Sequence, residues 1–198
     1  MMRYLNLFIK RFADIIGSFI GMIIVSPILI IVAIAIKLDS KGPVFFRQER
    51  LGKNGEVFKI FKFRTMVVNA EHMGDGLKVS SAEDSRITKV GRFLRKTSID
   101  ELPQLLNVLI GEMSLVGPRP PATYYPYDGY ENYPDWAKKR FEMRPGITGY
   151  AAAKDRKSIT WDEKIKKDVE YVEKFSIWFD IRILLLTFVN VLKSKNVY

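Results

Sequence analysis

The chain has 198 residues, enough for one domain with a hydrophobic core. Its 32 Lys and Arg residues outnumber 22 Asp and Glu residues, and the net charge of +10 favours an anionic partner: nucleic acid, an anionic membrane surface or a phosphorylated substrate. The absence of cysteine excludes disulfides and thiolate metal sites, and a single histidine, His72, argues against a histidine zinc site or a Ser-His-Asp triad. Any metal would then be a hard cation bound by carboxylate and phosphate oxygens.

An uncharged apolar segment comes first in the chain. Residues 15–36 are rich in Ile and Val, and as a helix they would reach about 33 Å, enough for a hydrocarbon core of about 30 Å. So long an uncharged run favours a membrane segment over a buried core helix. Its length also argues against a secretory signal, although Ala33-Ile34-Ala35 resembles a cleavage site. We therefore expect residues 1–40 to anchor the chain in a membrane.

Two features indicate how this segment enters the membrane. Pro27 removes the helical hydrogen bond to the Ile23 carbonyl, and the Ser26 hydroxyl is placed to satisfy backbone groups freed there. The positive-inside rule also favours a cytoplasmic position for both ends, because basic residues flank both. They are Arg3, Lys10 and Arg11 before the segment, and Lys37, Lys41, Arg47, Arg50 and Lys53 after it. The sequence favours a re-entrant helix bent at Ser26-Pro27, with a proline-kinked spanning helix as the alternative.

The next residues predict a β-hairpin. Residues 44–51 and 57–64 have strand patterns and are joined by Gly52-Lys53-Asn54-Gly55, an Asn-Gly turn signal. Aromatic and basic residues alternate in the second strand, a pattern that is compatible with stacking on single-stranded nucleic acid. A half-buried strand with phenylalanines in the core and a lysine towards a phosphate explains it equally well. The neighbouring membrane segment favours this second interpretation.

Helical patterns follow. Residues 85–96 and 102–110 have helical apolar spacing, and Gly111 is the expected C-terminal stop of the second helix. The polar residues 69–85 before them predict a mobile loop.

The C-terminal part predicts two more helices. Residues 161–175 are charged with an apolar stripe, and residues 177–193, apolar on most faces, suit a core or membrane-surface helix. The sequence thus predicts a mainly helical α+β fold, in which residues 41–198 form a small cytosolic domain with a β-hairpin and amphipathic surface helices.

The most informative stretch is residues 97–104, which holds the adjacent acids Asp100 and Glu101. Because proline is accepted only in the first turn of a helix, Pro103 places both acids at a helix N-terminus, where free N–H groups gather. One interpretation is capping alone, since Ser98 and Glu101 match a capping box. The basic helix that leads into the pair favours a role in a site that binds anions.

Two arginines lie in rigid turns. Arg119 is flanked by prolines in Gly117-Pro118-Arg119-Pro120-Pro121, and Arg144 begins the run Arg144-Pro145-Gly146-Ile147-Thr148. Because proline fixes φ, these guanidinium groups have restricted positions, which suits bidentate binding of phosphate. A plain proline-rich turn is the alternative.

Several motifs, in order, resemble those of the bacterial sugar transferases, and more narrowly of the small monotopic phosphoglycosyl transferases. They are the Ser26-Pro27 break, Phe61-Lys62-Phe63-Arg64-Thr65-Met66, Asp100-Glu101-Leu102-Pro103-Gln104, Gly117-Pro118-Arg119-Pro120 and Arg144-Pro145-Gly146-Ile147-Thr148-Gly149. The resemblance covers nearly the whole chain. One segment departs from it: many members continue Leu-Ala-Gln-Val-Asn-Gly-Arg, where this chain has Tyr150-Ala151-Ala152-Ala153-Lys154-Asp155-Arg156. The donor sugar therefore does not follow from the resemblance.

The resemblance implies transfer of a phosphosugar from a nucleoside-diphosphate sugar, with UDP as the expected nucleotide, to a polyprenyl phosphate, with undecaprenyl phosphate as the expected lipid. Asp100 would be the nucleophile that forms an aspartyl-phosphosugar, and Glu101, with Asp100, would hold Mg²⁺. Lys62, Arg119, Arg144 and Asp168 fall on positions that the family uses around the substrate. The implied place is the cytoplasmic face of the bacterial inner membrane, with the phospholipid bilayer as a partner, in the first membrane step of glycoconjugate or polysaccharide assembly.

The residue types suit this chemistry on their own terms. Arginines and helix N–H groups neutralise a diphosphate, and both nucleophiles, a carboxylate and a lipid phosphate, are already anionic and need no base. Retaining glycosidase chemistry fits less well, because its carboxylates face each other at about 5–5.5 Å, whereas neighbours in a helix diverge. The rival class is a non-enzymatic, membrane-tethered basic module that binds anionic lipid or nucleic acid; it gives Asp100 and Glu101 no role. A scaffold that has lost activity is a third class, and the oligomeric state stays open, a homodimer included.

Overall fold

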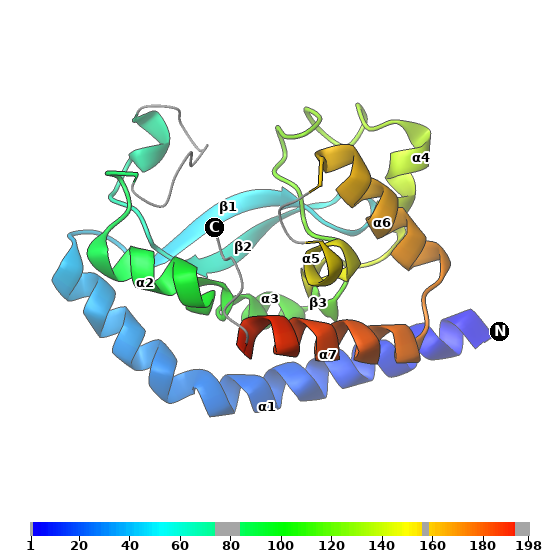
Figure 1. The fold of residues 1–198 in the computed structure, drawn as a ribbon, viewed down its shortest axis with the longest axis horizontal. Coiled ribbons are helices and arrows are strands. Elements are labelled where there is room, and N and C mark those ends of the chain that lie inside the picture. Colours follow the sequence, from blue (N-terminus) through cyan, green and yellow to red (C-terminus); the bar gives the residue numbers. More distant parts are fainter. Residues whose placement is uncertain (1, 74–83, 156–158, 193–198) are drawn as a thin grey trace.

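The computed structural model describes residues 2–73, 84–155 and 159–192. A long helix, α1 (Met2–Asp39), runs along one side of the molecule and is bent near its middle (Figure 1). Pro27 lies inside this helix. The Ser26 hydroxyl donates to the Ile23 carbonyl at 2.8 Å, the acceptor that Pro27 leaves without its helical N–H partner. The helix therefore continues through the proline.

By length and composition, α1 is able to cross a membrane, and only 11% of its most apolar 18-residue stretch is buried inside the protein. Some polar residues of α1 are buried against the rest of the protein. Lys10 Nζ lies 2.5 Å from the Asp180 carboxylate, and Asp14 Oδ1 accepts a hydrogen bond from the Leu115 N–H at 3.0 Å. The N-terminal half of α1 is thus attached to the domain through polar contacts that lipid does not supply.

The predicted β-hairpin is confirmed. Strands β1 (Phe45–Leu51) and β2 (Val57–Phe63) pair antiparallel, with Phe45 opposite Phe63. The connecting turn is a short 3-10 helix, η1 (Lys53–Gly55), in which Asn54 has a left-handed backbone with φ 56°. Asparagine accepts this conformation more readily than most residues, which is why the Asn-Gly pair predicted the turn.

The side chains of β2 do not simply alternate between buried phenylalanines and outward lysines. Phe58 and Ile60 are buried, and Lys62 follows on the same face because side chains two positions apart in a strand point the same way. Lys62 therefore points towards the interior beside the core instead of away from it. Phe63 is buried as well, so that neither it nor Phe58 is available to stack on nucleic-acid bases.

Three helical elements follow the hairpin: α2 (Lys89–Thr97), η3 (Ile99–Glu101) and α3 (Gln104–Ile110). The first begins later than the predicted residue 85, because the Thr88 hydroxyl caps it by accepting a first-turn N–H at 3.0 Å. As predicted, Gly111 ends α3, with a left-handed φ of 97°.

The remaining elements complete a mainly helical α+β fold, as predicted. They are η2 (Ala70–His72), β3 (Ser114–Val116), α4 (Asp135–Lys138), η4 (Lys139–Glu142), β4 (Gly146–Thr148), α5 (Tyr150–Lys154), α6 (Trp161–Glu173) and α7 (Ile177–Leu192). The helices predicted at 161–175 and 177–193 are confirmed, apart from their ends, as α6 and α7. The parallel pairing of β3 with β4 was not predicted, because three-residue strands carry too little pattern. Much of the polar run 69–85 lies outside the described residues.

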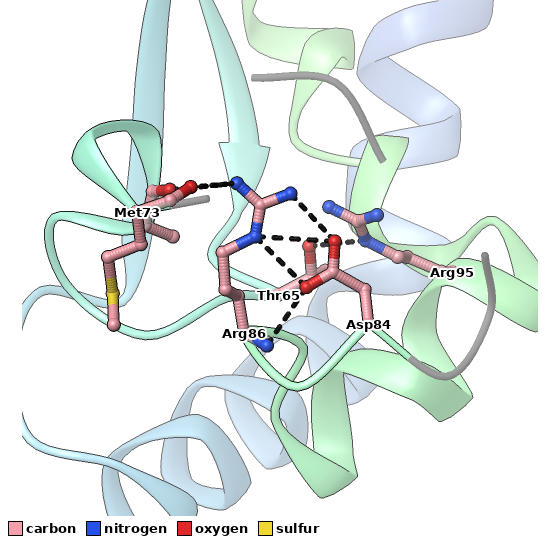
Figure 2. Close-up of polar contacts among 6 residues, drawn as sticks. Thr65, Met73, Asp84, Arg86 and Arg95 are labelled. Atoms are coloured by element: carbon pink, nitrogen blue, oxygen red, sulfur yellow. Dashed lines mark hydrogen bonds and ion pairs between the residues drawn. The ribbon is translucent and has the colours of Figure 1, made fainter. Parts of the chain in front are cut away.

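The buried Arg86 side chain joins the segment after β2 to the residues that precede α2 (Figure 2). Arg86 Nη2 lies 2.7 Å from Asp84 Oδ2, and Arg86 Nη1 donates to the Met73 carbonyl at 2.7 Å. Nearby, Arg95 Nε donates to the Thr65 hydroxyl at 2.8 Å. The Arg86 contacts thus join two segments that precede α2, whereas the Arg95 contact connects α2 itself to the residues after β2.

Candidate active site

The acidic pair lies in η3, between α2 and α3. Ser98 makes the turn that ends α2 and leads into η3. Ser98 has a left-handed backbone with φ 59°, and its N–H donates back to the Arg95 and Leu94 carbonyls. The Ser98 side chain makes no capping hydrogen bond. The capping-box interpretation is therefore wrong, and the acids occupy a 3-10 turn of their own instead of the first turn of α3. The Glu101 side chain is thus not engaged in capping.

Glu101 instead meets two cations from distant parts of the chain. Lys62 Nζ, near the end of β2, lies 2.6 Å from Glu101 Oε1, and Arg119 Nη2 lies 3.3 Å from the same oxygen. Burial raises the pKa of Glu101, but Lys62 and Arg119 outweigh burial and lower this pKa to about 2. Glu101 is therefore ionised at neutral pH, and its charge is compensated within the site.

The neighbouring Asp100 is in a different state. Across residues 2–73, 84–155 and 159–192, no side chain donates a hydrogen bond to its carboxylate. Burial raises the pKa of Asp100, and although Lys62 opposes burial, the charge of Glu101 adds to it, so that the pKa is about 6. At neutral pH most of this carboxylate is ionised and free of side-chain partners, which suits a nucleophile.

Arg119 and Arg50 add positive charge beside the pair. Glu101 raises the pKa of Arg119 above its ordinary value, and the Arg119 side chain is 53% exposed, within reach of a substrate. Burial, followed by the nearby Arg119, lowers the pKa of Arg50 to about 10. An anionic ligand would relieve the repulsion between these two guanidinium groups. From the sequence alone, Arg50 is only one of the basic residues that follow the membrane segment.

Arg144 lies elsewhere. Its Nε donates to the Gly111 carbonyl at 2.7 Å, at the end of α3 that is farther from the acidic pair. Arg11 joins it there, donating to the Val108 carbonyl at 2.7 Å and to the Leu109 carbonyl at 3.1 Å. Both arginines thus donate to carbonyls at the C-terminus of α3, where positive charge is favoured by the helix dipole.

Asp168 pairs with Arg140, and its charge also acts on Arg119. It is 2% exposed on α6, and its Oδ2 lies 2.5 Å from Arg140 Nη2. Of the six residues that the sequence analysis places around the reaction, the structure thus brings together Lys62, Asp100, Glu101 and Arg119. The Ser26-Pro27 pair is on α1.

A residue that the sequence analysis missed connects α3 to the hairpin. Asn107 is fully buried, its Oδ1 accepts from the Phe61 N–H at 2.9 Å, and its Nδ2 donates to the Lys59 carbonyl at 3.0 Å. The amide thereby pairs with the free edge of β2, next to Lys62. The signal in the sequence was a polar residue inside the apolar run 105–110.

The acids suit a cation that is shared with a substrate. In the part of the chain that the structure describes, no group of three or more His, Cys, Asp or Glu side chains is placed to hold a metal. Mg²⁺ needs no such group, because it is commonly bound by one or two carboxylates together with substrate phosphates and water. Asp100 has no side-chain partner, and both cations contact Oε1 of Glu101, which leaves Oε2 for a metal. The residues present therefore fit Mg²⁺.

The site thus combines two adjacent acids with Lys62 and Arg119, and such cations suit phosphate groups. The bacterial sugar transferase family matches residues 5–194, and the chain belongs to that family. The galactosyl transferase CpsE of Streptococcus agalactiae is 46% identical over 195 residues, which cover 93% of this chain and 42% of CpsE.

Two more relatives carry other sugars in their names. The UDP-glucose:undecaprenyl-phosphate glucose-1-phosphate transferase of Klebsiella pneumoniae is 41% identical over 98% of this chain and 42% of its own length. The UDP-N-acetylgalactosamine-undecaprenyl-phosphate N-acetylgalactosaminephosphotransferase of Aeromonas hydrophila is 40% identical over 93% of this chain and 44% of its own length. This chain thus spans less than half the length of these relatives.

Proposed function

We propose that this chain transfers a phosphosugar from a UDP-sugar to undecaprenyl phosphate, with Asp100 as the nucleophile and UMP as the leaving group. Such a transfer is the first membrane step in assembling a glycoconjugate or polysaccharide. The observation that carries the proposal is the contrast within one turn: Glu101 is compensated by two cations, whereas Asp100 has no side-chain hydrogen-bond partner among the described residues. One carboxylate is thus suited to organise charge and the other to react.

The reaction has two displacements at the same phosphorus. An Asp100 carboxylate oxygen attacks the sugar-bearing phosphorus of the donor, a phosphorus–oxygen bond to Asp100 forms, and the bond to the bridging oxygen breaks to release UMP. A phosphate oxygen of the lipid then attacks the same phosphorus. The bond to Asp100 breaks, the free carboxylate returns, and the sugar leaves on a lipid diphosphate. Neither attack requires a base, because both nucleophiles are anions.

The cations around the pair would bind the donor. Arg119 is exposed enough to move from Glu101 to a donor phosphate, and its delocalised charge suits that ligand. Lys62 stays on the inner side of Glu101 and maintains the charge of the acid. Mg²⁺, bound by Glu101 and Asp100 with the diphosphate, would neutralise the charge that develops on the leaving UMP.

We further propose that α1 is re-entrant, with both ends on the cytoplasmic face. Its N-terminal half contacts the domain through Lys10 and Asp180, and at its other end Asp39 Oδ2 accepts from the Val90 N–H at 2.9 Å. A straight spanning helix places its ends on opposite sides of the bilayer, where one domain cannot hold both. The bend in α1 (Figure 1) supports the same topology.

The apolar surface that faces away from the domain would lie in the membrane interface. Helix α7 runs beside α1 (Figure 1), and three of its exposed side chains are Trp178, Leu185 and Phe188. Tryptophan is favoured at membrane interfaces, where its ring is partly in lipid and partly in water. This placement would bring η3 to the depth of the phosphate of the lipid acceptor.

The donor sugar is the open part of this proposal. Relatives of similar identity are named for galactose, glucose and N-acetylgalactosamine, so overall identity does not select one. The chain departs from the family pattern at residues 150–156, of which 150–154 form α5. This segment is the first place to look for donor choice.

The proposal is tested by withholding the acceptor. The full chain in nanodiscs is incubated with Mg²⁺ and a panel of UDP-sugars, one at a time. With its own donor it should release one UMP per protein and gain the mass of one phosphosugar on Asp100. Binding of DNA or RNA without UMP release would favour the basic-module alternative instead. Turnover with acceptor present, but no adduct in its absence, contradicts the covalent mechanism.

A further inference from the structure

The turn that contains Arg119 is anchored through its carbonyl groups. Pro118, Pro120 and Pro121 have no backbone N–H, so carbonyls are nearly all that this segment offers for hydrogen bonding. Four consecutive carbonyls find donors: Gly146 N–H to Pro118 O at 2.9 Å, Arg140 Nη2 to Arg119 O at 2.7 Å, Arg50 Nη1 to Pro120 O at 3.2 Å, and Leu51 N–H to Pro121 O at 3.0 Å. At Arg119 itself, the donor is thus a side chain.

That side chain is deeply buried. Arg140 is 1% exposed, and its Nη2 also lies 2.5 Å from Asp168 Oδ2, so one nitrogen bridges a carboxylate and the Arg119 carbonyl. Among the described residues, Arg140 Nε and Nη1 have no hydrogen-bond partner. The side chain lines a cavity of about 10 Å³, room for about one water molecule.

A buried ion pair with unused donors is a poor device for stability alone. Apolar residues of similar volume often stabilise a core as well or better. What an apolar pair does not supply is a hydrogen bond to the Arg119 carbonyl. The contacts run from Asp168 through Arg140 to the main chain of Arg119, whose guanidinium lies 3.3 Å from Glu101.

We propose that Arg140, braced by Asp168, is a positioning residue that fixes the main chain at Arg119, so that the Arg119 guanidinium meets the diphosphate of the donor. This inference rests on the proposed function for the identity of the ligand. Asp168 then acts on the donor only indirectly, by holding Arg140, and does not contact the substrate itself.

The test is a double-variant cycle with UDP as a non-reacting probe. Arg140→Met with Asp168→Leu removes the ion pair but keeps an apolar core, so the chain should fold. Calorimetry on the full chain in nanodiscs, with Mg²⁺, should show UDP binding weakened about tenfold or more. In an Arg119→Gln background, the same change should weaken binding less than about twofold, because its effect passes through Arg119.

A control is the Arg86–Asp84 pair, in which Arg86 is buried and Asp84 is partly exposed (Figure 2). Arg86→Met with Asp84→Leu removes a similar pair and should leave UDP binding unchanged. Arg140→Lys is a second variant for the case in which the double substitution does not fold. Lysine keeps the positive charge but lacks the second nitrogen of the guanidinium group. It should weaken UDP binding when Arg119 is present and not in the Arg119→Gln variant.

Equal weakening with and without Arg119, or unchanged binding in a folded Arg140 variant, overturns the inference. If the coupling is found but no phosphosugar adduct forms, the positioning role stands and the covalent mechanism fails. A wild-type chain that does not bind UDP overturns both.

Discussion

Lys62 and Glu101 are 39 positions apart in the chain, and their side chains meet at 2.6 Å. Arg119 reaches the same carboxylate oxygen from a third segment, at 3.3 Å. One residue earlier, Asp100 has no such partner in the described chain. Charge compensation and the candidate reactive group therefore belong to different residues of one turn.

Replacing Asp100 by Asn should abolish the phosphosugar adduct and lower turnover by at least about 10³-fold, because a neutral amide is a poor nucleophile. UMP release and intact-protein mass measure both effects. Glu101→Gln is the matched comparison: it keeps the nucleophile and should still form the adduct, more slowly. Near-native turnover in folded Asp100→Asn protein removes Asp100 as the nucleophile.

The stability of the chain should depend on the ionisation of Asp100. Its folded pKa of about 6 exceeds the ordinary 3.8, so the protonated form is favoured by folding. The stability that the protonated Asp100 contributes is fully present below pH 3.8 and is lost as the pH rises through about 6. Asp100→Asn should therefore stabilise the metal-free protein by up to about 3 kcal/mol at pH 7.5, and not at pH 3.5. Thermal melts in EDTA measure this difference, and an equal shift at both pH values contradicts it.

Lys62→Met should destabilise the fold by about 1–3 kcal/mol, because it leaves Glu101 partly buried with a weaker partner. Lys59→Met is the matched control on the same strand. Its side chain is 64% exposed and lies 3.9 Å from Glu49, so its loss should cost less than about 1 kcal/mol. Urea denaturation compares the two variants, and equal losses would show that the Lys62 contact is no stronger than a surface pair.

Asn107→Leu should cost about 2–4 kcal/mol, because it leaves the Phe61 N–H and the Lys59 carbonyl without their buried partner. Since this edge of β2 adjoins Lys62, UDP affinity should fall as well. Denaturation and calorimetry on one preparation separate the two effects. Unchanged stability would mean that water replaces the amide at this edge.

The absence of cysteine makes single-cysteine labelling a clean test of topology. Asn6→Cys and Lys53→Cys lie on either side of the membrane segment. With a re-entrant α1, a membrane-impermeant maleimide should label neither position from outside intact cells and both in inverted vesicles. Adding Ser26→Ala and Pro27→Ala should straighten the helix and move position 6 to the outside. Outside labelling of position 6 with native Ser26-Pro27 contradicts the re-entrant topology.

The sequence by itself determined the local elements, and it predicted four residues that the structure brings together in the candidate site. Apolar spacing, the Asn-Gly turn and Gly111 act over a few positions, so the hairpin, α3, α6 and α7 were predictable. Lys62, Asp100, Glu101 and Arg119 were found because each lies in a short motif that limits its chemistry.

Only the tertiary structure decided which side chains meet. Ser98 ends α2 instead of capping α3, which separates Glu101 from the role that its spacing suggested. Arg144 contacts the far end of α3, and Asp168 lies in the interior with Arg140. Such contacts depend on the directions of side chains on elements packed far apart in the chain. Local patterns of apolar and polar residues carry no record of those directions.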